Sequence, residues 1–109
     1  MARHRSKESY YRQVLLDIIG DDYIDFIFNI EYSKSGLSIA ETKKVPNPIG
    51  ECDVLAQRID FLYDLYEIKS TKSGLSKARF QLTRAKNLLD FIVDTYIYIG
   101  NENKIINYR

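Results

Sequence analysis

The stretch GECDVLA at residues 50–56 and the triplet Glu67-Ile68-Lys69 decide the fold of this chain. Both stretches are typical of strands, because β-branched and apolar residues alternate in them with charged ones. Side chains two residues apart lie on the same face of a strand. We therefore expect Glu67 and Lys69 to project together, and Glu51 and Asp53 likewise. Two neighbouring strands of this kind predict a compact site of carboxylates and one ammonium group, which can hold a hard divalent cation.

The elements around these two strands predict an α/β fold, with a mixed central sheet flanked by helices in the order α-β-β-β-α-β. Apolar residues at helical spacing predict a first helix over residues 6–19, with Ser6 as N-cap, and Gly20 ends it. A second helix follows the loop at residues 71–76, with Ser76 as its cap. The expected strands cover residues 23–32, the stretch that begins at Gly50, residues 62–70 and residues 95–99, with a short edge strand at 105–106.

This order, together with Asp53 and the later Glu67-Ile68-Lys69, resembles the PD-(D/E)xK nuclease superfamily, whose members have the restriction-endonuclease-like fold. Its nearest patterns are small archaeal Holliday junction resolvases and RecB-type nucleases. The chain departs from the motif in having Cys52 in place of the proline before the acid, a proline that many members also lack. The resemblance implies a Mg²⁺-dependent deoxyribonuclease, with Mn²⁺ able to substitute. It covers residues 6–100, so we expect residues 1–109 to form a single nuclease domain.

The residues of this chain suit that chemistry. The carboxylates of Asp53 and Glu67 are hard oxygen ligands for Mg²⁺, and the resemblance implies the Ile68 carbonyl as a third ligand. Lys69 is expected to stabilise developing charge or to orient the attacking water, two roles that the sequence leaves open. Taken singly, Asp53 could instead cap a turn, and Glu67 and Lys69 could form an ion pair. Charges in buried central strands are costly unless they are paired or bind metal, which favours the site.

Two further catalytic candidates come from the helices. Glu8 lies three residues before Tyr11 in the apolar stripe of the first helix, and the resembled family often has an acid there. The alternative is that Glu8 only complements the helix dipole. Gln81, in the second helix, matches a glutamine of RecB-type members, although the tyrosine that follows it in their pattern is missing. A surface role is its alternative.

Charge is unevenly distributed along the chain, whose net charge is +1. Residues 17–31 contain five acids and no Lys or Arg, whereas residues 69–86 contain six bases and no acid. A basic segment that begins at the candidate site is expected for binding a phosphate backbone, although a solvated helix face has the same pattern. The expected nucleic-acid contacts are Lys72, Lys77, Arg84, Lys43 and Lys44.

The expected function is hydrolysis of DNA phosphodiester bonds with low sequence specificity, directed at branched or single-stranded DNA. The alternatives are a non-catalytic nucleic-acid-binding module with the same fold and a protein-interaction domain. No membrane span is expected, because no apolar run is long enough, and one cysteine excludes an internal disulfide. These features predict an intracellular, cytoplasmic protein. The resemblance further implies a homodimer, and the small size suits a gene of a virus or mobile element of a prokaryote.

Overall fold

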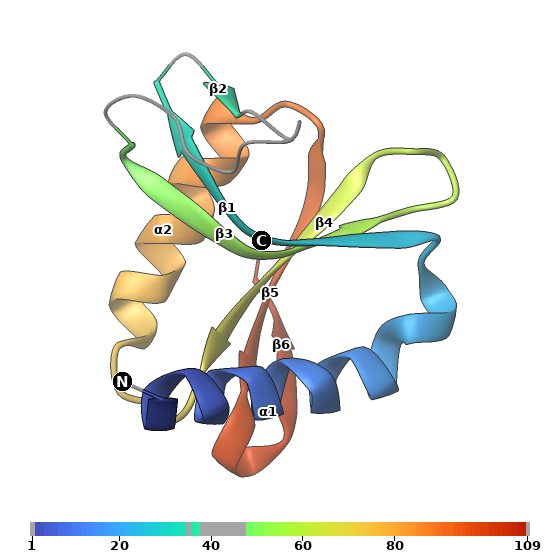
Figure 1. Ribbon diagram of the computed structural model, residues 1–109. Helices are drawn as coiled ribbons and strands as arrows, with labels where there is room; N and C mark the ends of the chain where they lie inside the picture. The colour runs from blue at the N-terminus through green and yellow to red at the C-terminus, as the bar shows by residue number, and fades with distance from the viewer. Residues whose placement is uncertain (1, 35, 38–47, 109) are drawn as a thin grey trace.

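The computed structural model describes residues 2–34, 36–37 and 48–108. Among them, one six-stranded sheet lies between two helices (Figure 1). The helices are α1 (Ala2–Ile19) and α2 (Leu75–Leu88), and short 3₁₀ turns cover Gly20–Asp22 and Gly100–Glu102. The strands are β1 (Asp25–Ser33), β2 (Gly36–Leu37), β3 (Gly50–Gln57), β4 (Tyr63–Lys69), β5 (Ile92–Ile99) and β6 (Lys104–Asn107). The predicted α/β class is thus confirmed.

The sheet is mixed, with the strand order β2-β1-β3-β4-β5-β6. All neighbouring pairs are antiparallel except β4 and β5, which are parallel. A parallel pair needs a long crossover connection, and α2 supplies it, because this helix lies between β4 and β5 in the chain. None of the described helices is long and apolar enough to cross a membrane.

Two helix starts differ from the prediction. The first helix begins at Ala2, so Ser6 lies inside it and the predicted N-cap is wrong. The second helix begins at Leu75, after Gly74, which has a left-handed backbone with φ of 82° and forms no side-chain capping bond. Gly74 adopts that conformation without the penalty that a Cβ brings. Ser76 is therefore a residue of the first turn, and its predicted role as a cap is also wrong.

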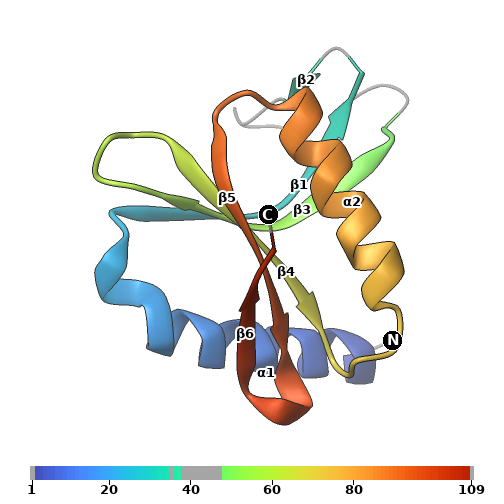
Figure 2. The ribbon, with the colours of Figure 1, turned by 180° about the vertical axis from the view of Figure 1, so that it is seen from behind.

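Each helix covers one face of the sheet (Figure 2). On one face, α2 packs its stripe of Ala78, Leu82 and Ala85 against buried strand residues. On the other face, Leu15 and Ile19 of α1 pack against a separate set. In β4 and β5 successive residues alternate between these two cores, as the pleat of a strand requires. The sheet is consequently buried on both faces, so charged side chains within it are costly unless they are paired or bind a metal ion.

The strands β3 and β4 form a fork. Their pairing runs from Gln57 and Tyr63 to Val54 and Tyr66, and then it ends. Beyond that point β3 continues beside β1, whereas β4 continues to Lys69 beside β5. Figure 1 shows the two strands diverging. Residues 50–53 and 67–69 thus border a gap in the sheet, and these are the segments that the sequence singles out.

At this fork β3 also changes its alternation. Cys52 packs in the core beneath α2, whereas Val54, two residues later, packs in the core beneath α1. The pairing of β1 with β3 includes Phe28 with Val54 and Ile30 with Cys52, but it omits the intervening pair of Asn29 and Asp53. Asn29 has a left-handed backbone with φ of 55°. The kink in the two paired strands is therefore centred on Asp53.

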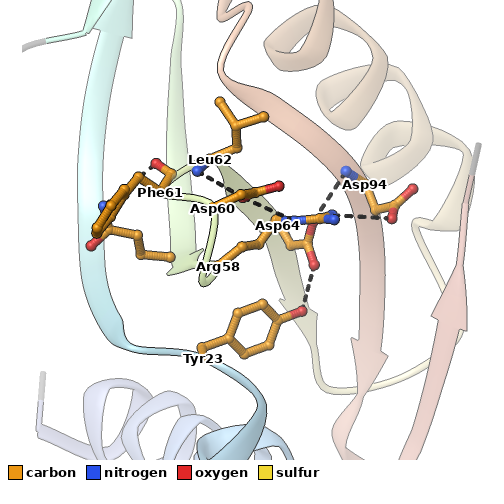
Figure 3. Close-up of polar contacts among 8 residues, drawn as sticks. Tyr23, Arg58, Asp60, Phe61, Leu62, Asp64 and Asp94 are labelled. Atoms are coloured by element: carbon orange, nitrogen blue, oxygen red, sulfur yellow. Dashed lines mark hydrogen bonds and ion pairs between the residues drawn. The ribbon is translucent and has the colours of Figure 1, made fainter.

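The opposite end of β3 and β4 is a hairpin anchored by Arg58 (Figure 3). The Arg58 guanidinium lies 3.2 Å from the carboxylate of Asp64, which is 4% exposed, and 3.7 Å from that of Asp94. The Tyr23 hydroxyl donates a hydrogen bond of 2.5 Å to the other oxygen of Asp64. Burial and this bond raise the pKa of Tyr23, so it remains a donor. The buried carboxylate is satisfied by these partners, and it holds the hairpin against β5.

Candidate active site

A cavity of about 350 Å³ lies at the fork between β3 and β4. It collects four carboxylates from α1, β3 and β4, together with two lysines and a short stretch of β4. The residues that line it are Lys7, Glu8, Tyr11, Glu51, Asp53, Glu67, Ile68, Lys69 and Ser70. The structure thus brings Glu8, Asp53, Glu67, Ile68 and Lys69 together, as the sequence predicts.

The side chain of Asp53 bridges the gap of the fork. Its Oδ2 accepts a hydrogen bond of 2.9 Å from the backbone N–H of Ile68. The pairing of β3 with β4 has already ended at Val54 and Tyr66, so the carboxylate takes the place of a backbone acceptor. This bond fixes the orientation of Asp53 and leaves its second oxygen available to a ligand.

Burial and the charges of neighbouring carboxylates raise the pKa values of the two central acids. The pKa of Glu67, which is 7% exposed, is raised to about 8, first by burial and then by the charge of Asp53. The pKa of Asp53 is raised to about 6 by burial, against the opposing effect of the Ile68 hydrogen bond. The charge of Lys69 lowers both values but does not outweigh burial. The two carboxylates therefore lack sufficient positive charge in the protein alone.

This shortage of positive charge fits a divalent cation. Among residues 2–34, 36–37 and 48–108, no group of three or more His, Cys, Asp or Glu side chains converges to hold a metal ion by itself. Mg²⁺, however, is usually bound by one or two carboxylates, and water and substrate phosphate complete its shell. Asp53 and Glu67 supply two carboxylates, and Ile68 lines the same cavity. The residues present therefore fit Mg²⁺ bound with an open shell and do not form a closed protein cage.

Glu8 and Glu51 extend the acidic wall toward solvent. Both side chains are exposed, yet both line the cavity. Burial of part of Glu51 and the charge of Glu8 raise the pKa of Glu51. Glu8 also raises the pKa of Asp53. The charge of Glu8 therefore acts on the strand carboxylates. Because α1 begins at Ala2, Glu8 lies beyond the first turn, and its alternative role of complementing the helix dipole there does not apply.

Gln81 and the predicted nucleic-acid contacts lie outside this cavity. Gln81 is half-buried on α2, and its Oε1 has no hydrogen-bond partner among the described residues. Lys77 is exposed, and Lys72 forms an ion pair of 3.7 Å with Glu102. Arg84 is half-buried, with its guanidinium 5.4 Å from the centre of the Phe80 ring. Lys43 and Lys44 lie outside the described residues.

The sequence pattern missed three residues of the cavity wall, Lys7, Tyr11 and Ser70. The ring of Tyr11 packs closely over Gly100, where a Cβ atom would lie 2.4 Å from the ring. Gly100 therefore permits a close approach that another residue would block. Lys7 and Tyr11 could have been predicted from their positions next to Glu8 on the helix. Ser70 could have been predicted because it directly follows Lys69.

Comparison of the chain with protein-family models, with curated proteins and with solved structures finds no match. The function must therefore be inferred from the geometry and charge of the site.

Proposed function

We propose that this protein is a metal-dependent nuclease of the PD-(D/E)xK type that hydrolyses DNA phosphodiester bonds. One observation carries the proposal: Asp53 and Glu67, from two diverging strands, line one cavity with Lys69. The order α1, β1, β3 with Asp53, β4 with Glu67-Ile68-Lys69, α2 with Gln81, and β5 supports the resemblance, and the short strands β2 and β6 are additions to it. The restriction-endonuclease-like fold is part of this proposal.

Each residue has a role that follows from its position. Asp53 and Glu67 would hold Mg²⁺ together with the Ile68 carbonyl, and the ion would supply Lewis-acid stabilisation of the phosphate when bound. Lys69 lies on the same wall as a fixed positive charge and stabilises the charge that develops on the phosphate oxygens. Glu8 orients water at the open side of the cavity. Gln81, on the facing helix, is proposed to contact a water or a phosphate.

The substrate is proposed to be single-stranded or branched DNA, cut with little sequence preference. Exposed Lys77 and Lys72, at and before the start of α2, contribute phosphate contacts that carry no base information. Ser70, which precedes the loop that leads to α2, lines the same cavity as Lys7 of α1. A DNA strand bound by Lys72 and Lys77 would pass close to the carboxylates of Asp53 and Glu67. A homodimer, which would place two sites on two strands, remains a prediction.

The proposal is tested by incubating plasmid, single-stranded and branched DNA with the protein in Mg²⁺, in Mn²⁺ and in a chelator. We expect cleavage with either metal and none with the chelator. Asp53→Asn and Glu67→Gln should reduce cleavage to background, and Lys69→Ala should reduce kcat by about 10²–10³-fold. Asp17→Asn, which removes an exposed acid of α1 outside the cavity, is the matched control. Binding of DNA by wild type without cleavage in any metal would instead establish a non-catalytic module.

A further inference from the structure

A second cavity adjoins the first along α1. Its volume is about 400 Å³, and it is lined by Glu8, Ser9, Arg12, Asn29 and Glu51. Glu8 and Glu51 also line the cavity that contains Asp53 and Glu67. The two cavities therefore share a wall, and a ligand that extends from the first along α1 enters the second.

Arg12 supplies the basic side chain of this second cavity. It is half-buried, and its Cζ lies 4.7 Å from the centre of the Phe28 ring. It forms no ion pair with any described residue. A guanidinium that lies against a ring keeps its N–H groups at the edge of its plane, where they can bind an anion in a bidentate manner. The contact with Phe28 also limits the rotamers of Arg12, so less side-chain entropy is lost on binding.

Asn29 places an amide in the same cavity. Its left-handed backbone, with φ of 55°, occurs at the point where β1 ceases to pair regularly with β3. Asparagine tolerates this conformation better than most residues. Its side chain can donate two hydrogen bonds. The carboxylates of Glu8 and Glu51 repel anions, so the attraction for a phosphate in this cavity must come from Arg12, with Asn29 as a neutral donor.

We propose that Arg12 and Asn29 form a subsite for the backbone phosphate next to the one that is cleaved. This inference rests on the proposed nuclease function and adds to it the path of the substrate: the DNA strand follows the middle of α1, from Glu8 to Arg12. The basic segment in the sequence indicates α2 as the contact face. The subsite on α1 places a phosphate contact on the other flank of the carboxylates, so the bound strand crosses the fork.

The test compares Arg12→Ala with Arg79→Ala. Arg79 also lies against a ring, with its Cζ 5.3 Å from the centre of Tyr108, but it lines neither cavity. It points to the opposite side of α2 from Lys77 and Gln81, by helical spacing. Both variants remove one positive charge, so they lower the net charge of the protein equally. A difference between them therefore reports a local contact.

Affinity for a labelled single-stranded oligonucleotide is measured in chelator, where no cleavage occurs, as a function of salt. Loss of a charged hydrogen-bonding partner should weaken binding about tenfold for Arg12→Ala. It should also flatten the log–log salt dependence by about 0.7. Arg79→Ala should stay within about twofold of wild type, and Arg12→Lys, which keeps the charge without the flat fork, should lie between the two. In Mg²⁺, Arg12→Ala should raise KM and leave kcat nearly unchanged.

Equal affinities and salt slopes for Arg12→Ala and Arg79→Ala, with a wild type that binds and cleaves, would overturn the subsite and leave the nuclease standing. Arg12→Ala that lowers thermal stability without changing affinity would show that Arg12 serves only the helix and Phe28. A wild type that binds but does not cleave would refute the nuclease, while the affinities would still decide the subsite. A wild type that binds no nucleic acid would refute both.

Discussion

Glu67 is the residue for which the sequence prediction, the observed burial and the expected chemistry can be compared directly. Its position in a central strand predicts a buried acid, and the structure leaves it 7% exposed beside Asp53. A buried acid whose pKa is raised is more easily protonated in the folded state than in the unfolded chain. Its charge is therefore tolerated at neutral pH only with a compensating cation, which is the electrostatic condition for a metal site.

The raised pKa values predict how stability depends on pH. Above pH 4 the folded, metal-free protein binds more protons at Asp53 and Glu67 than the unfolded chain does, so the free energy of unfolding falls as pH rises. The loss continues through the folded-state pKa values of about 6 and about 8. Glu67→Gln should flatten this fall, by at most about 1.4 kcal/mol per pH unit for one proton.

Urea denaturation of wild type and Glu67→Gln from pH 5 to pH 9, in chelator, measures this effect. Addition of Mg²⁺ at pH 8 should stabilise wild type and leave Glu67→Gln almost unchanged, because the ion binds the folded state. Identical pH slopes in the two proteins would show that Glu67 is not the strained acid of the cavity.

At the scale of the element, the hairpin between β3 and β4 departs from the usual chemistry of a turn. Phe61 donates its N–H to the Arg58 carbonyl, and Arg58 donates to the Leu62 carbonyl. This arrangement is a turn followed by a left-handed residue, a position at which glycine is common. Here the residue is Phe61, with φ of 69° and a side chain that is 68% exposed. The absence of glycine explains why residues 58–60 lack a recognisable turn signal.

We expect Phe61→Gly to stabilise the protein by about 0.5–1 kcal/mol. Relief of the left-handed strain, about 1–2 kcal/mol, exceeds the added entropy of glycine in the unfolded chain. Ile59→Gly is the matched control, because Ile59 is 84% exposed in the same hairpin and does not have a positive φ. It should be neutral or destabilising in urea denaturation. A loss of stability for Phe61→Gly equal to that for Ile59→Gly would show that the Phe61 ring stabilises the fold despite its exposure.

At the scale of the whole molecule, exposed acidic and exposed basic side chains gather in different places. Exposed Asp21, Asp22 and Asp25 lie at and after the C-terminal end of α1, whereas α2 carries exposed bases on the opposite side of the sheet (Figure 1). Two of the predicted DNA contacts on α2, Lys77 and Arg84, differ in environment: Lys77 is exposed, whereas Arg84 is half-buried. Arg84 lies against Phe80, lines an apolar pocket, and acts on the pKa of the buried Tyr32 hydroxyl. Its contacts are those of a packing residue.

The two side chains should therefore respond differently to substitution. Lys77→Ala should flatten the log–log salt dependence of DNA binding by about 0.7 on single strands or 0.9 on duplex, with no loss of stability. Arg84→Ala should lower the free energy of unfolding by about 1 kcal/mol or more, because it removes a stacked, partly buried side chain. Salt titrations and urea curves of both variants check the division. An Arg84→Ala protein of wild-type stability with a flattened salt slope would contradict it.

The amino-acid sequence by itself determined which residues share a face wherever the backbone is regular. Alternation along residues 67–69 predicted that Glu67 and Lys69 project together, because this periodicity depends only on local backbone geometry, and both line the cavity. Alternation fails between Cys52 and Val54, where β3 changes face, and the expectation for Glu8 came from the resemblance. The short edge strand predicted at 105–106 lies within β6, whereas both helix starts were misplaced. The α2 helix begins after the left-handed Gly74 and has no side-chain cap, so the predicted serine signal does not mark its start.

The tertiary structure decided what those residues surround. The divergence of β3 and β4, the kink at Asn29 and Asp53, and the second cavity with Arg12 all arise from pairing between strands and packing beneath helices that are distant in sequence. The same packing turned Arg84 inward and left Lys77 in solvent. Charge patterns along a chain cannot distinguish these cases, because the cost of burying a cation depends on its partners in space.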